Sequence, residues 1–89
     1  MNTIYKYHLP IQDEVILEVP ELFRPLHVGE KEGELCLWAL VDPATPSQQR
    51  LIFIYGTGHL LHPTEMFNYI GSVVMSNNLV WHVADGGRE

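Results

Sequence analysis

Seven short stretches of the chain are apolar throughout or alternate between apolar and polar residues, and each of them predicts a β-strand. Gly, Pro and Asn, the usual turn formers, separate the stretches. Gly33 suits a hairpin loop of three to five residues, and Asn78 suits a tight turn. The pattern predicts a mainly β protein, a small antiparallel sheet that is barrel-like or a sandwich. The expected strands are Thr3–Leu9, Glu14–Val19, Leu26–Lys31, Glu34–Asp42, Arg50–Gly56, Tyr69–Met75 and Leu79–Ala84.

Helix is scarce in the pattern. Only Thr64–Tyr69 is expected to form one helical turn, with Pro63 before it and Gly71 after it. We expect residues 1–84 to form a single antiparallel β domain. Residues 85–89, which include two glycines, are expected to form a flexible C-terminal tail.

Two expected strands are apolar on both faces. An antiparallel sheet that has one face in solvent needs apolar residues on its other face alone. A chain this short has few further residues that could pack against the second apolar face. We therefore predict a homo-oligomer that covers this surface. The alternative is a closed barrel or small sandwich that covers a central strand within one chain. The expected interface residues are Trp38, Leu40, Ile52 and Ile54.

Composition narrows the class of protein. The chain has 89 residues, of which 46% are apolar, so it has room for one core. Its net charge of −6 supplies no basic stripe for nucleic acid. Its one cysteine excludes an internal disulfide. With no targeting segment or membrane-length apolar run in view, we expect a cytoplasmic protein that binds neither a membrane nor nucleic acid directly.

The clearest local motif is the Gly-Thr-Gly-His run at residues 56–59, which leaves an expected strand. Gly56, Thr57, Gly58 and His59 could turn their backbone N–H groups toward an anion, with Tyr55 and Arg50 completing a ligand site. The alternative is a tight strand exit in which the glycines adopt positive φ.

Catalytic and metal-binding patterns are weak. No spacing of the histidines with Cys36 matches a zinc site, and Cys36 sits among large apolar residues that favour a buried, inert thiol. His82 alternates with Val80 and Ala84, which favours a half-buried histidine with satisfied ring nitrogens. No serine lies in a nucleophile elbow. We expect no catalytic residues, no metal and no cofactor, and so a protein that is not an enzyme.

A set of motifs runs along the chain, at residues 4–7 with 9–11, then 33–43, 55–59, 69–73 and 79–83. In combination these motifs resemble an uncharacterised family of short proteins found in phage genomes and bacterial prophage regions. After His59 the sequence departs from the family, because Leu60-Leu61-His62 replaces a more polar loop. The family brings no activity and no catalytic residue.

The resemblance implies a small accessory protein that acts by binding. The first functional prediction is a phage-type homo-oligomer that counters host defence by sequestering a small anionic, nucleotide-like signal. Lys6 and Arg24 are further charge partners, and Tyr55 or Trp38 is expected to stack on a base. The alternative is an inhibitor or adaptor that acts on a host defence protein through an acidic rim or an apolar sheet surface.

Overall fold

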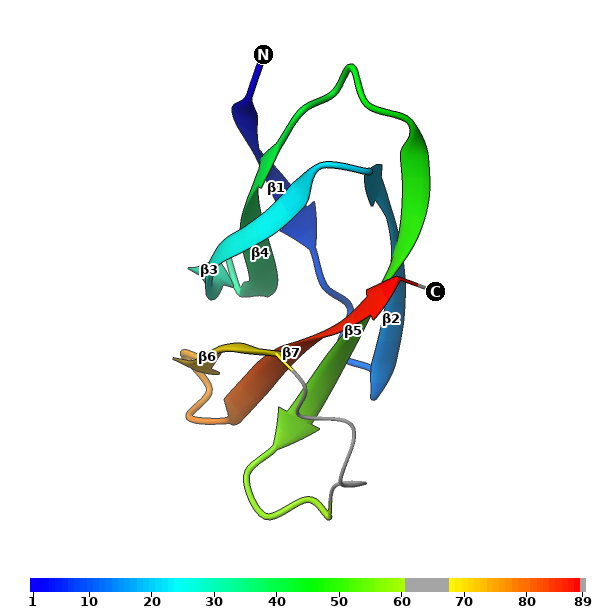
Figure 1. Cartoon of the computed structure of the whole chain (residues 1–89). Helices are drawn as coiled ribbons and strands as arrows, with labels where there is room; N and C mark the ends of the chain where they lie inside the picture. Colours follow the sequence, from blue (N-terminus) through cyan, green and yellow to red (C-terminus); the bar gives the residue numbers. More distant parts are fainter. Residues whose placement is uncertain (61–67, 89) are drawn as a thin grey trace.

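The computed structural model describes residues 1–60 and 68–88, and these form two antiparallel sheets packed face to face (Figure 1). One sheet has the strand order β1-β4-β3 and the other β2-β5-β7-β6. The expected β class is confirmed as a sandwich rather than a closed barrel, and the described residues contain no helix. The strands are β1 (Thr3–His8), β2 (Glu14–Pro20), β3 (Phe23–Lys31), β4 (Glu34–Val41), β5 (Ser47–Gly56), β6 (Asn68–Val74) and β7 (Val80–Arg88).

The core lies between the two sheets, and alternation along each strand places its residues there. In β4 the residues Leu35, Leu37, Ala39 and Val41 are at most 1% exposed, as expected for one face of a pleated strand. The other members come from β2, β3, β5, β6 and β7 and from the segments after β1 and β6: Leu9, Val15, Val19, Phe23, Val28, Ile52, Ile54, Val73, Met75 and Val83.

Strands β4 and β5, which are apolar on both faces, are covered mostly by residues of the same chain, and this corrects the expected interface. Ile52 and Ile54 belong to the core and are at most 1% exposed, so their side chains cannot meet a second copy. On the opposite face of β5, Phe53 and Tyr55 are also buried. Trp38 stays half-buried on the outer face of β4, as does Leu40, because their neighbours along the strand point into the core.

Tight turns join neighbouring strands. Residues Glu32 and Gly33 both have positive φ, and Lys31 pairs with Glu34, so this hairpin has a two-residue loop rather than the longer loop expected. Asn78 adopts a φ of 68°, which confirms its place in a left-handed turn.

The chain end is part of the sheet, which corrects the expected boundary after Ala84. Strand β7 runs to Arg88 and pairs with β5 as far as Arg50. Asp85 is buried and binds Arg50 through two hydrogen bonds. Most of the expected helical turn (64–67), like Glu89, lies outside the described residues, and Tyr69 belongs to β6.

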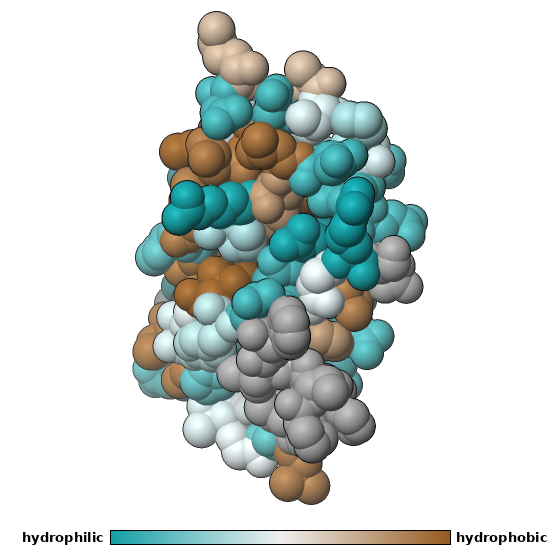
Figure 2. All heavy atoms as spheres, viewed as in Figure 1, coloured by the Kyte–Doolittle hydropathy of each residue, from teal (hydrophilic) through white to brown (hydrophobic). Residues whose placement is uncertain are grey.

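Figure 2 shows apolar and polar surface interspersed on the viewed face rather than one continuous apolar area. Among the described residues, no helix is long and apolar enough to cross a membrane.

Candidate functional site

The Gly56–His59 loop turns directly after β5 and closes on itself. The N–H of Gly56 donates to Nδ1 of His59 at 3.0 Å, and the N–H of His59 donates to the carbonyl of Gly56 at 3.2 Å. Gly58 has a φ of 90°, a conformation that favours glycine. Because two of the N–H groups already have partners within the loop, these bonds favour the tight-turn interpretation over an anion nest.

A chain of three side chains anchors the same loop to the sheet. Thr57 Oγ1 lies 2.8 Å from Nε2 of His82, and Nδ1 of His82 lies 2.9 Å from the hydroxyl of Tyr69. His82 is half-buried with both ring nitrogens hydrogen-bonded, which confirms the expectation for it. The order of groups matches a nucleophile, a base and an orienting residue. The orienting group is a neutral phenol, however, and supplies no negative charge to stabilise an imidazolium, so we interpret the chain as an anchor.

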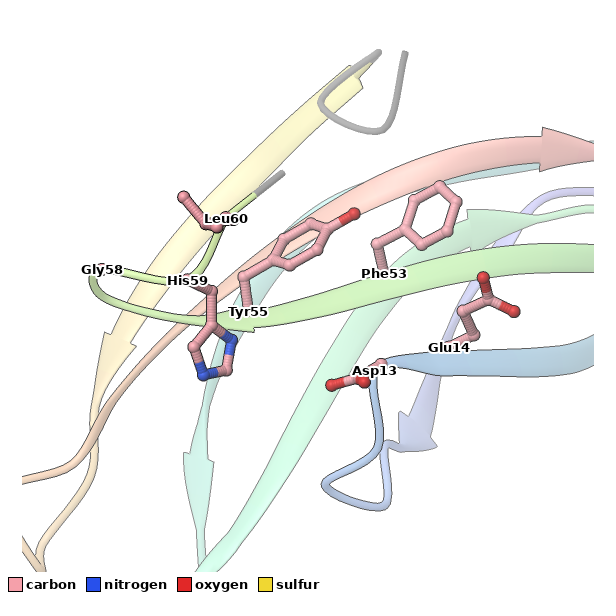
Figure 3. Close-up of a pocket in the computed structure, with 7 residues that line it drawn as sticks. All are labelled: Asp13, Glu14, Phe53, Tyr55, Gly58, His59 and Leu60. Atoms are coloured by element: carbon pink, nitrogen blue, oxygen red, sulfur yellow. The ribbon is translucent and has the colours of Figure 1, made fainter. Parts of the chain in front are cut away.

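A hollow of about 720 Å³ lies beside the loop. Figure 3 shows Phe53 and Tyr55 standing on β5, with Asp13 and Glu14 on the β2 side and His59 on the loop side. Leu60 and Gly58 complete its lining. The rings of Phe53 and Tyr55 are stacked, with centroids 6.0 Å apart and planes 24° apart. The hollow therefore joins a flat aromatic wall to two carboxylates.

The charge of this hollow is negative. Asp13 and Glu14 are exposed, and neither side chain makes a hydrogen bond or ion pair with a described residue. Arg50, the cation expected there, instead pairs with Asp85 on the core side of its sheet at 2.6 Å between Nη2 and Oδ2. These hydrogen bonds to Asp85 raise the pKa of Arg50 above its ordinary value. No lysine or arginine lines the hollow within the part of the chain described.

The other expected cations lie on the opposite sheet. Strand pairing puts Lys6 and His27 beside Trp38, and Arg24 beside Leu40, on the outer face of β1-β4-β3. The His27 and Trp38 rings have centroids 5.9 Å apart. Residues 55–59 thus come together as expected, but Arg50, Lys6, Arg24 and Trp38 do not join them.

Comparison with protein families matches residues 1–89 to the family described as Domain of unknown function (DUF7352). The chain belongs to this family. Comparison with curated proteins and with solved structures finds no significant match. The family description names no activity, so the function of this site is inferred from its own geometry.

The sequence indicates Asp13 and Glu14 only as members of an acidic rim and does not place them at the hollow. Asp13 and Glu14 stand at the start of an expected strand, where a solvated turn explains acidic residues equally well. What places them at the site is the pairing of β2 with β5, in which Glu14 lies opposite Phe53. Alternation within each strand was the available signal, but it does not tell which strands are neighbours.

Proposed function

We propose that this protein is a non-enzymatic binding protein that receives an arginine side chain of a protein partner in the hollow beside the Gly56–His59 loop. The observation that carries the proposal is that two carboxylates, Asp13 and Glu14, line the same hollow as the stacked rings of Phe53 and Tyr55, with no cation beside them among the described residues. Among the predictions from sequence, this geometry favours the adaptor or inhibitor that uses its acidic rim.

The chemistry of arginine fits both walls. A guanidinium is planar, stays charged and forms paired hydrogen bonds with a carboxylate, so Asp13 supplies its natural acceptor. The same flat group stacks on aromatic rings, which attract cations through their π-electrons. A phosphate or nucleotide would instead meet two negative charges at this place, with no lysine or arginine among the described lining residues to offset them.

Calorimetric titration with a short arginine peptide tests the proposal. The matched control is the same peptide with citrulline, which keeps the shape of arginine and removes its charge. We expect the arginine peptide to bind and the citrulline peptide to bind at least about tenfold more weakly, since a charge-assisted hydrogen bond contributes about 1.5–3 kcal/mol. The variant Asp13→Asn should lose the preference for arginine while its thermal unfolding is unchanged, because Asp13 is exposed and its carboxylate makes no hydrogen bond or ion pair with another described residue.

Equal binding of the two peptides would contradict the proposal. Binding of a nucleotide from a panel of signalling nucleotides, with affinity lost in Thr57→Val or Gly58→Ala, would replace it by the sequestering function expected first. The proposal includes a cytoplasmic location, a phage or prophage origin for the family and a host defence protein as the partner. Those three points rest on the sequence resemblance and on composition alone.

A further inference from the structure

The two sheets differ in how their edges are protected, and this difference points to a second copy of the chain. Each sheet has two edge strands, β1 and β3 in one and β2 and β6 in the other. An unprotected edge strand is a template for pairing, so proteins usually cover or distort it. The question is which of the four edges is left regular.

Strands β3 and β6 are blunted. Strand β3 contains Pro25 and a register shift directly after it, and β6 has a register shift between Tyr69 and Gly71. The two strands also pack against each other, closely enough that a Cβ on Gly71 would lie 3.2 Å from Cγ2 of Val28. Glu30 reinforces this side by accepting hydrogen bonds from the N–H and hydroxyl of Ser76.

Strands β1 and β2 form the other side of the sandwich and are more regular. Strand β2 has a proline only at its last residue, Pro20. Both pair on one side only and without a register shift, β1 with β4 and β2 with β5. Both present large apolar residues to solvent, because Ile4 is 56% exposed and Ile16 is 53% exposed. They run in opposite directions along the molecule, as their colours show in Figure 1.

We propose that two copies of this chain form a symmetric dimer in which β1 of each copy pairs antiparallel with β2 of the other. A two-fold axis along the strands, between the sheets, exchanges the two layers, so each three-stranded sheet continues into the four-stranded sheet of the other copy. Because β1 and β2 are antiparallel within one chain, the same rotation makes them antiparallel across the interface. The backbone N–H and C=O groups at the edges of β1 and β2 are then hydrogen-bonded in one self-complementary interface, which is the type of interface that most homodimers have.

One register matches both the faces and the charges of the two strands. With Ile4 opposite Ile16, Lys6 stands opposite Glu14, and all four side chains lie on the outer faces of their sheets. On the inner faces, Tyr5 then meets Val15. Cross-strand pairs of this kind stabilise a sheet, whereas a shift by one residue would place apolar side chains on the wrong face. In this register Glu14 gains a cation, and Asp13 stays as the carboxylate of the hollow.

Charge reversal tests this interface through the mass of the assembly, a readout that does not depend on arginine binding, although Glu14 also lines the hollow. Light scattering on the unmodified chain should give twice the mass of 10.2 kDa at micromolar concentration. Lys6→Glu and Glu14→Lys should each raise the dissociation constant by at least about tenfold, because like charges then face each other across the new sheet. The double variant should restore the dimer. Lys31→Glu, an exposed change on the blunted strand β3, is the matched control and should leave the mass unchanged.

Three outcomes would overturn the inference. The first is a monomer at micromolar concentration, and the second is a dimer that survives both single reversals. The third is a dimer that Trp38→Glu dissociates while Lys6→Glu does not, which would place the contact on the outer face of β4 instead. Circular dichroism of each variant shows whether a lost dimer still contains folded subunits, since the exposed side chains of Lys6 and Glu14 are not needed for the core.

Discussion

Arg50 and Asp85 form a two-pronged ion pair, with Nε 2.8 Å from Oδ1 and Nη2 2.6 Å from Oδ2. The pair joins β5 to β7 on the core side of their sheet, and the guanidinium carbon lies 5.4 Å from the ring centroid of Phe23 in the facing sheet. Asp85 also accepts a hydrogen bond from the N–H of Gly87. The carboxylate of Asp85 therefore holds both the end of β7 and the side chain of Arg50 in place at the edge of the core.

Removing either charge should destabilise the protein strongly. Asp85→Asn leaves the mostly buried guanidinium of Arg50 unpaired, and loss of one partner of a buried pair costs about 3 kcal/mol. The double variant Arg50→Met with Asp85→Asn should lose less than the sum of the two single changes, because no unpaired charge is left. Urea unfolding of the three variants measures this coupling, and strictly additive losses would show that the pair contributes little beyond its separate groups.

The expected role of Arg50 shows what local sequence patterns cannot supply. The alternation of apolar residues predicted every strand, because the face that a residue takes depends only on its neighbours along the strand. The partner of Arg50 stands 35 positions later, within a stretch whose two glycines favoured a tail. Likewise, Ile52 and Ile54 were assigned to an interface because the pattern shows two apolar faces but not the facing sheet that covers one of them.

Gly86 marks a close approach of β7 to the aromatic wall of the hollow. A Cβ at this position would lie 2.6 Å from Cε2 of Phe53 and 3.1 Å from Cγ of Leu51. Because Phe53 is buried, its ring has little room to move, and Gly86→Ala should destabilise the protein by about 1–3 kcal/mol. Thermal unfolding measures the loss.

Gly87→Ala is the matched control for that change. Its φ of 86° strains an alanine, but no atom lies within 4 Å of the added Cβ. We expect a loss of about 1–2 kcal/mol from backbone strain alone. Phe53→Leu should then relieve part of the Gly86→Ala loss and none of the Gly87→Ala loss. Equal relief in both backgrounds would show that the ring is not what the new Cβ meets.

Tyr7 makes the stability depend on alkaline pH. Burial, and secondarily the neighbouring Tyr5, raises the pKa of Tyr7 above 10.0. The folded chain therefore holds this proton more tightly than the unfolded chain, and the stabilisation is complete below pH 10 and lost as the pH rises through the folded-state pKa. Unfolding by urea should show stability falling above pH 10. Tyr7→Phe should flatten that fall, and an unchanged slope in this variant would assign the effect to other groups.

Glu30 links the two sheets at the blunted side. Its carboxylate oxygens lie 3.0 and 3.1 Å from the N–H of Ser76, and one lies 2.9 Å from the hydroxyl. Glu30→Gln keeps one acceptor and removes the charge, so we expect a loss of about 1 kcal/mol. Hydrogen exchange at the Ser76 N–H should become faster, and the opening free energy calculated from its protection should fall by a similar amount. Protection that is unchanged there would mean that the turn holds itself without the carboxylate.

The position of β7 governs when this protein can fold during synthesis. It is the last strand among the described residues, yet it lies between β5 and β6 and pairs with both. When only β1 to β6 have emerged from the ribosome, the larger sheet therefore lacks the strand that joins β5 to β6. Until β7 is present, β5 pairs with β2 alone and its other edge has no strand partner. Strand β6 then lacks the one strand with which it pairs in this sheet. The larger sheet is therefore complete only once residues 80–88 have been added, and a nascent chain that stops before them is prone to aggregate.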